Sequence, residues 1–172
     1  MNIFDKVELL PSDMLDSRSI SESLIRSNPD EVYHLAAQSF VGASFDQPLY
    51  TSNVTGFGVI RMLEEIMKFN KKIRFYQASS SEMFGSSKPP QNEKTEFNPQ
   101  SPYGVSKVAA FHTTKYFRQA HGIFASNGIL FNHESPRRGL NFVTRKITHS
   151  LARILIGKEK KIELGDISTK RD

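Results

Sequence analysis

Apolar residues recur along this chain in two patterns, short blocks and longer stretches with helical spacing. Short blocks bounded by Gly, Pro, Asn or Ser are typical of buried strands, and apolar residues three to four positions apart are typical of amphipathic helices. The blocks predict five strands, at residues 7–10, 31–37, 72–78, 125–131 and 161–164. The helical spacing predicts four helices, at about residues 19–28, 48–69, 102–120 and 143–156.

Strands and helices alternate in this prediction, and such alternation indicates a mainly parallel sheet with helices on both faces. We therefore expect an α/β, Rossmann-like fold. Ligands of such sheets bind beyond the carboxyl ends of the strands. Four polar or small-residue segments fall at these ends: Asp13, Leu35–Ser39, Ser79–Glu82 and Asn132–Arg138.

Local signals set the ends of the predicted helices. Ser19 and Glu22 have the spacing of a capping box, and Asn28 with the following proline ends that helix. Pro102 opens the third helix, and Gly122 is a C-cap signal at its other end.

The composition is that of an ordinary globular protein. The 172 residues are 38% hydrophobic and 24% charged, with a formal net charge of +5. That length suits a single domain, and the modest positive charge suits anionic ligands such as nucleotide phosphates. We expect no nucleic-acid partner, because the sequence contains no dense block of Lys and Arg.

The chain contains no cysteine, which excludes disulfides and thiolate metal sites. No residue cluster suggests another metal site. The sequence also lacks a signal-peptide pattern at its N-terminus and an apolar run of about 18 residues that could span a membrane. We therefore expect a cytoplasmic protein without a membrane partner.

Tyr103 and Lys107 are the main candidates for chemistry. They lie four residues apart on a predicted helix, so the phenol and the ammonium share one helical face. A nearby cation favours the phenolate and makes the tyrosine a usable base near neutral pH. Ser80 and Glu82, at the end of the preceding strand, would add a hydroxyl and a carboxylate. The alternative for Tyr103 and Lys107 is an ordinary pair on a helix surface. The alternative for Glu82 is an acidic residue in a helix first turn, where the helix dipole favours it.

These residues, together with the strand end Leu35–Ser39, resemble the extended short-chain dehydrogenase/reductase superfamily. The run from Asn127 to Gly139, with Phe142–Thr148 after it, is similar to the GDP-mannose 4,6-dehydratase family. Resemblance to dTDP-glucose dehydratases is weaker, because that family has an Asp-Glu pair where this chain has Ser81-Glu82. Epimerases are also a weaker match, since they need no carboxylate for elimination.

The resemblance implies an NADP-dependent dehydration of GDP-mannose to GDP-4-dehydro-6-deoxy-D-mannose, a precursor of GDP-fucose. Tyr103 would deprotonate the C4 hydroxyl of mannose, and Ser80, where the family usually has Thr, would hydrogen-bond that oxygen. Glu82 would remove the C5 proton, after which water leaves from C6. Lys107 would assist Tyr103 and hold the nicotinamide ribose.

The resemblance also implies ligand contacts elsewhere in the chain. Asn132 and Lys146 would contact the substrate. Besides Lys107, the residues matching cofactor contacts are Asp13, Leu35, Ala36, Ala37, Gln38, Ser39, Tyr50, His133 and Arg138. Asp13 could alternatively cap a turn, and Arg138 could be a solvent-exposed cation.

The chain departs from the family pattern at its beginning. It contains no G-x-G-x-x-G motif, and the family's first strand and Gly-rich loop have no counterpart. We therefore expect residues 1–172 to form a single, partial NAD(P)-binding Rossmann-like domain. Family members associate, so a homodimer or homotetramer is expected. A catalytically inactive fragment that acts as a nucleotide-sugar or protein-binding module is the alternative function.

Overall fold

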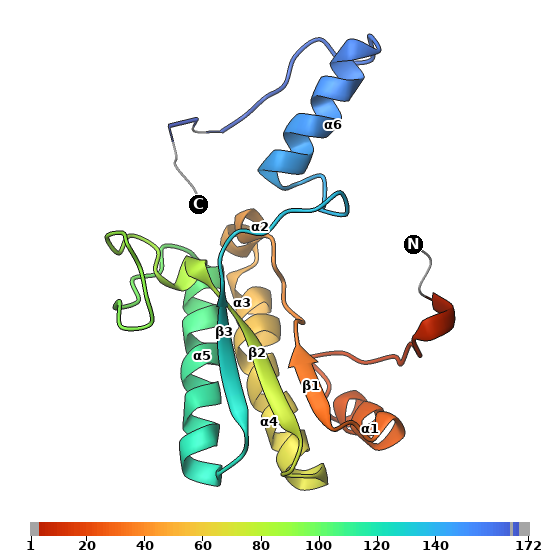
Figure 1. The fold of residues 1–172 in the computed structure, drawn as a ribbon, viewed down its shortest axis with the longest axis vertical. Helices are drawn as coiled ribbons and strands as arrows, with labels where there is room; N and C mark the ends of the chain where they lie inside the picture. Colours follow the sequence, from red (N-terminus) through yellow and green to blue (C-terminus); the bar gives the residue numbers. More distant parts are fainter. Residues whose placement is uncertain (1–3, 166, 169–172) are drawn as a thin grey trace. The chain divides into compact units, whose positions relative to one another are not determined.

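The structure of the chain is a computed structural model that describes residues 4–165 and 167–168 (Figure 1). It contains two compact units, Met1–Leu130 and Phe131–Asp172. The single domain expected over residues 1–172 stays a prediction, and each unit is described by itself.

A parallel sheet forms the centre of the first unit. Its strands are β1 (Glu31–His34), β2 (Arg74–Ser80) and β3 (Ala125–Leu130), in the order β1-β2-β3. The last pair between β1 and β2 joins His34 to Gln77, whereas β2 and β3 stay paired as far as Ser80 and Leu130. The predicted Rossmann-like class with a parallel sheet is thereby confirmed.

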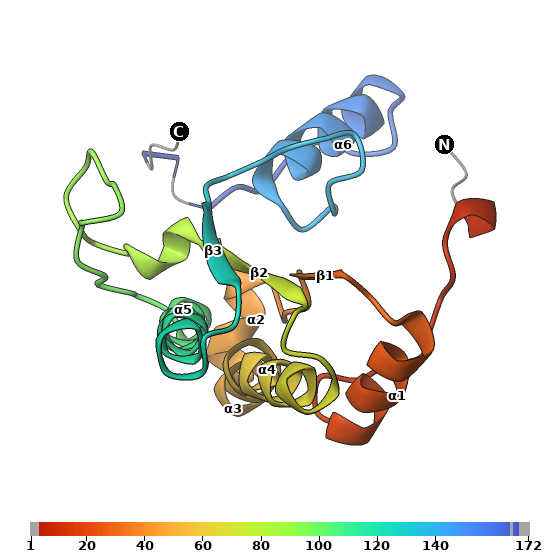
Figure 2. The same cartoon turned by 60° about the horizontal axis from the view of Figure 1, so that its bottom comes forward.

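The helices of this unit gather on one face of the sheet (Figure 2). Each of the two strand-to-strand connections carries a long helix, α4 (Gly58–Phe69) or α5 (Pro102–His121). Both connections step across the sheet in the same direction, so right-handed crossovers place both helices on the same side. The second helical layer that we expected has no counterpart among the described helices of this unit, and Tyr33 of β1 stays 64% exposed.

The hydrophobic core lies between the sheet and these helices. α1 (Ser17–Ser27) packs against α4, and the core that they share includes side chains from β2, β3 and α5. The core residues include Ile20, Leu24, Val59, Leu63, Ile66, Ile73, Phe75, Ala110, Phe117 and Ile123.

The helix predicted over residues 48–69 is divided in three. α3 (Pro48–Thr51) leads into a π-helical stretch, η2 (Ser52–Phe57), which continues into α4. The glycines at positions 56 and 58 mark the region where the helical geometry changes. A short helix, α2 (Val41–Asp46), precedes α3 and was not predicted.

The predicted helix ends are confirmed in part. Asn28 takes a left-handed conformation after α1, with φ of 40°, and Gly122 does so after α5, with φ of 69°. The N-cap of α1 is Asp16, whose carboxylate accepts from the backbone N–H groups of Arg18 and Ser19. The capping box predicted at Ser19 was therefore wrong by three positions.

Two predicted strands, at residues 7–10 and 161–164, do not form. A strand satisfies its backbone N–H and C=O groups through a partner, and a short apolar block without one has no ladder to join. Among the described residues, β1 pairs only with β2 and β3 only with β2. The first unit also contains two short 3₁₀ helices, η1 (Phe4–Lys6) and η3 (Ser81–Met83).

Among its described residues, the second unit contains one helix, α6 (Val143–Leu155), which confirms the predicted helix at residues 143–156. Gly157 follows it with φ of 71°. Within the described part of the chain, no helix has the length and apolar character needed to cross a membrane.

Candidate functional site

Ser80 and Glu82 lie where β2 ends. Ser80 is the last residue of the strand and the N-cap of η3, and its Oγ accepts a hydrogen bond from the backbone N–H of Glu82 at 3.2 Å. Both side chains are half-buried. Ser80 and Glu82 thus place a hydroxyl and a carboxylate at the edge of the sheet where the strands end, as the sequence predicted.

Tyr103 and Lys107 occupy the first turns of α5. Ser101 caps this helix by accepting from the backbone N–H of Gly104 at 3.0 Å, and Pro102 is its first residue. The Nζ atom of Lys107 lies 5.7 Å from the centroid of the Tyr103 ring. The predicted pairing of phenol and ammonium on one face of the helix is therefore observed.

Lys107 also reaches the sheet. Its Nζ donates to the carbonyl oxygen of Ala78 at 2.7 Å, two residues before Ser80. Burial lowers the pKa of Lys107 to about 8, because water cannot stabilise the ammonium inside the protein. At pH 7 the group still carries a proton, so a cation stands beside the phenol and favours loss of the phenolic proton.

The turn that carries Glu82 packs directly against the start of α5. A Cβ atom added at Gly104 would lie 2.7 Å from the carbonyl oxygen of Glu82 and 3.0 Å from Cβ of Pro99. Glycine is therefore required for this close approach. The contact brings the segment with Ser80 and Glu82 next to the helix with Tyr103 and Lys107.

The segment after β1 lies at the same edge of the sheet. Of the predicted cofactor contacts there, Leu35, Ala36 and Ser39 are exposed, and Ala37 and Gln38 are half-buried. The backbone N–H of Gln38 donates to Oγ1 of Thr55, which anchors the segment to η2. The side-chain oxygen of Gln38 is buried and has no hydrogen-bond partner among the described residues.

Asp13 and Tyr50 are less closely tied to this edge. One carboxylate oxygen of Asp13 accepts from the backbone N–H of Leu15 at 2.8 Å, as expected from the turn-capping alternative. Tyr50 lies on α3 with 49% of its surface exposed. The cofactor contacts predicted for these two residues stay predictions.

The remaining predicted contacts belong to the second unit. His133 is exposed and donates from Nδ1 to the carbonyl of Phe131 at 3.0 Å. The guanidinium of Arg138 lies over the Phe142 ring, 3.5 Å from its centroid, and its Nε is 3.6 Å from a carboxylate oxygen of Glu134. Asn132 precedes this loop, and Lys146 is exposed on α6.

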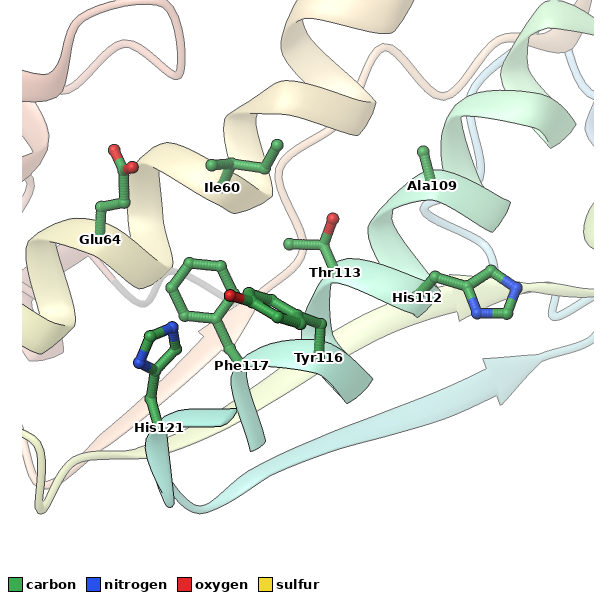
Figure 3. A pocket seen from close by; sticks show the side chains of 8 residues that line it. All are labelled: Ile60, Glu64, Ala109, His112, Thr113, Tyr116, Phe117 and His121. Carbon is green, nitrogen blue, oxygen red and sulfur yellow. The ribbon is translucent and has the colours of Figure 1, made fainter. Parts of the chain in front are cut away.

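A groove of about 620 Å³ runs between α4 and α5 (Figure 3). Its lining comes from Ile60 and Glu64 on α4 and from His112, Tyr116 and His121 among the α5 residues. None of the candidate catalytic or ligand-binding residues lines it. The groove is therefore separate from the candidate site.

Sequence reasoning missed the Ala78 carbonyl as the partner of Lys107. It also missed the buried side chains of Gln77, which bonds to the same carbonyl, and of His34, which bonds to Gln77. The available signal was strand alternation. In β2, Phe75 and Gln77 share the face that packs on the helices, and a polar residue at such a position requires a buried partner.

Comparison with known proteins identifies the family. The family model for GDP-mannose 4,6 dehydratase matches residues 2–172 of this chain. The chain belongs to the GDP-mannose 4,6-dehydratase family. The resemblance predicted from the run Asn127–Gly139 is thereby confirmed.

Curated members of the family include close relatives. GDP-mannose 4,6 dehydratase 1 of Arabidopsis thaliana is 53% identical over 164 residues, which cover 93% of this chain and 45% of that protein. The GDP-mannose 4,6-dehydratase of Vibrio cholerae serotype O1 is 49% identical, with 93% of this chain and 44% of that protein covered. The chain thus spans less than half the length of these relatives.

Solved structures share the fold. RMD from Pseudomonas aeruginosa, complexed with NADPH, superposes with a TM-score of 0.87 at 28% identity, covering 96% of this chain and 57% of that one. DesIV, a dTDP-glucose 4,6-dehydratase from Streptomyces venezuelae solved with NAD and TYD bound, has a TM-score of 0.75. At 20% identity over 85% of this chain and 44% of that one, DesIV supports the fold alone.

Proposed function

We propose that this chain carries the catalytic residues of a GDP-mannose 4,6-dehydratase, which converts GDP-D-mannose to GDP-4-dehydro-6-deoxy-D-mannose with NADP as a recycled hydride carrier. The observation that carries the proposal is the contact of Lys107 with both Tyr103 and the end of β2. It provides a cation beside a phenol at the sheet edge where Ser80 and Glu82 emerge. Family membership supplies the substrate class.

The residues at this edge fit a nicotinamide dinucleotide. Lys107 has three N–H donors, and within the described part of the chain only one of them has a hydrogen-bond acceptor, the Ala78 carbonyl. The other two suit the hydroxyls of a ribose. The buried, unpartnered oxygen of Gln38 can accept from a ligand donor, and the exposed small residues Ala36 and Ser39 permit close approach.

The further cofactor contacts that we propose are those of the family pattern. Leu35 and Ala37 would contribute backbone and apolar contacts beside Gln38, and Asp13 and Tyr50 would contribute polar groups. In the second unit, His133 and Arg138 are suited to phosphate or carboxamide groups, since both offer N–H donors. When bound, NADP supplies the acceptor for the hydride from C4 and returns that hydride to C6.

The chain's own residues would move the protons. Tyr103 takes the proton of the C4 hydroxyl, which Ser80 orients by a hydrogen bond, and the ketone formed at C4 acidifies the hydrogen at C5. Glu82 removes that C5 proton and passes it to the C6 hydroxyl, which leaves as water. The proton that Tyr103 took balances the one that C5 regains when hydride adds at C6. Two bases are needed because the C4 and C5 protons leave from different atoms in separate steps.

The GDP part of the substrate is anionic and suits the basic second unit. Asn132 and Lys146 are the proposed substrate contacts, and Lys146 offers an exposed ammonium on α6. Arg138 is a planar cation that pairs well with phosphate oxygens.

Turnover of GDP-mannose tests the proposal. The purified chain is incubated with GDP-mannose and NADP, and mass spectrometry follows the appearance of a product lighter by one water. We expect Glu82→Gln to reduce turnover by about 100- to 10,000-fold, because it removes a general base.

Glu93→Gln, an exposed position in the loop before α5, is the matched control and should turn over like the unchanged chain. A folded chain that gives no product would reject the enzyme and favour the binding-module alternative. Equal turnover of the Glu82→Gln and Glu93→Gln variants would reject the role of Glu82.

A further inference from the structure

The acceptor of Lys107 is shared. The carbonyl oxygen of Ala78 accepts from Nζ of Lys107 at 2.7 Å and from Nε2 of Gln77 at 3.1 Å. No carboxylate in the described part of the chain forms an ion pair with Lys107. The position of this ammonium therefore depends on a backbone carbonyl, and whatever holds that carbonyl also places the ammonium.

The amide of Gln77 can have only one orientation. A carbonyl oxygen only accepts hydrogen bonds, so the Gln77 atom facing Ala78 is the amide nitrogen. The amide oxygen then faces Nδ1 of His34 at 2.9 Å. An amide oxygen also only accepts, so Nδ1 of His34 must carry the proton.

The other imidazole nitrogen completes the assignment. Nε2 of His34 lies 3.3 Å from the sulfur of Met14, which is at most a weak acceptor. Burial lowers the pKa of His34 to about 4, and the charge of Lys107 acts in the same direction. His34 is therefore neutral at pH 7, with its proton on Nδ1 and none on Nε2.

The three side chains lie out of solvent, with exposures of 3% for His34, 0% for Gln77 and 3% for Lys107. Water can replace few of their hydrogen bonds, so each group depends on the next. His34 and Gln77 are also opposite each other at the last pair between β1 and β2, where the backbone is held by the sheet.

We propose that Gln77 and His34 are positioning residues for Lys107. The His34 imidazole orients the Gln77 amide, the amide holds the Ala78 carbonyl, and the carbonyl fixes the ammonium beside Tyr103. The role of Lys107 in catalysis rests on the proposed function. The series of hydrogen bonds from His34 to Lys107 does not depend on it.

The first test needs no variant. Long-range ¹H–¹⁵N NMR on the unchanged chain at pH 7 reports which imidazole nitrogen carries the proton. We expect the Nδ1–H tautomer at His34. An Nε2–H tautomer or an imidazolium would overturn the proposed order of hydrogen bonds.

The second test asks whether Gln77 acts on Lys107. Gln77→Met keeps the size of the side chain and removes both hydrogen bonds. We expect the ¹⁵Nζ signal of Lys107 to move toward the position of exposed lysines and the carbonyl ¹³C signal of Ala78 to move with it. Ile73→Val, a small deletion in the neighbouring core, is the control for lost stability and should leave both signals in place.

Unchanged Lys107 and Ala78 signals in a folded Gln77→Met variant would show that Gln77 is only structural. If that variant does not fold, the tautomer of His34 in the unchanged chain still tests the proposed order of hydrogen bonds. Neither readout requires turnover. If the protein shows the Nδ1–H tautomer but forms no product, only the proposed function is rejected. If it is active but shows the Nε2–H tautomer, only the positioning role of Gln77 and His34 is rejected.

Discussion

Lys107 keeps a charge inside the protein, and that has a thermodynamic cost. The ammonium loses most of its hydration and receives one carbonyl in return. Burial accordingly lowers its pKa from the ordinary 10.5 to about 8. The cost is consistent with a residue kept for chemistry, because a neutral side chain of similar length would fill the same space without it.

This cost predicts a pH dependence of stability. Between pH 8 and 10.5 the unfolded chain binds more protons at Lys107 than the folded chain does, so the free energy of unfolding rises with pH. We expect the difference between the unchanged chain and Lys107→Met to grow in favour of the unchanged chain by about 3 kcal/mol from pH 7 to 10.5. Urea unfolding at several pH values measures it, and a constant difference would contradict the burial of the ammonium.

The lowered pKa of His34 predicts that the free energy of unfolding also depends on pH on the acid side. Its pKa is lowered to about 4 in the folded chain, so between pH 6.5 and 4 the unfolded chain again binds more protons. The contribution of neutral His34 to the free energy of unfolding is complete above pH 6.5, and about 3 kcal/mol of it is lost as the pH drops to 4.

His34→Asn supplies the comparison, because Asn offers an N–H donor to Gln77 and does not titrate. We expect this variant to lose the His34 part of the acid dependence. If urea unfolding of the two proteins shows parallel slopes between pH 6.5 and 4, the imidazole is not buried as a neutral group.

The contact between η3 and α5 is the element-scale feature on which the candidate site depends. The first turn of the helix lies against the backbone of Glu82 because position 104 has no side chain. Gly104→Ala should destabilise the chain by about 1 to 3 kcal/mol, since a Cβ there would meet a carbonyl oxygen that cannot easily move. It should also lower turnover, because it pushes Glu82 away from Tyr103.

Gly56→Ala is the matched control. Its Cβ would lie 3.5 Å from the nearest atom, the carbonyl oxygen of Ser106, which is an ordinary contact. We expect its melting temperature to stay close to that of the unchanged chain. A Gly104→Ala variant as stable as Gly56→Ala would mean that η3 does not pack on α5 as described.

Sequence reasoning predicted the elements that have strong local signals. The helix from Pro102, the strand before Ser80 and the helix from Val143 all formed close to their predicted bounds. The strands predicted at residues 7–10 and 161–164 did not, because a strand depends on a partner that no local pattern specifies. The one-sided helical layer likewise depends on strand order, which alternation alone does not determine.

In the candidate site, too, the sequence predicted what local patterns specify and missed the contacts between distant residues. The spacing of Tyr103 and Lys107 gave their shared helical face, and the end of β2 gave Ser80 and Glu82. The hydrogen bonds from Lys107 to Ala78 and onward to Gln77 and His34 join residues far apart in sequence. The register of β1 with β2 brings His34 to Gln77, and the packing of α5 against β2 brings Lys107 to Ala78.

At the scale of the whole molecule, the candidate residues are divided between the two units. The residues proposed for proton transfer and the segment Leu35–Ser39 belong to the first unit, and Asn132, His133, Arg138 and Lys146 belong to the second. The chain also spans less than half the length of its curated relatives, 45% of one and 44% of another. Association into a homodimer or homotetramer stays a prediction, which light scattering on the purified chain tests.

The central claim is that the chain dehydrates GDP-mannose by moving a hydride from C4 to C6 of one sugar. The most direct measurement uses GDP-mannose deuterated at C4, incubated with the chain and NADP, with the product read by NMR and mass spectrometry. We predict a 4-keto product that has lost one water and retains the deuterium at C6. A product without deuterium at C6, or no product from a folded chain, would contradict the claim.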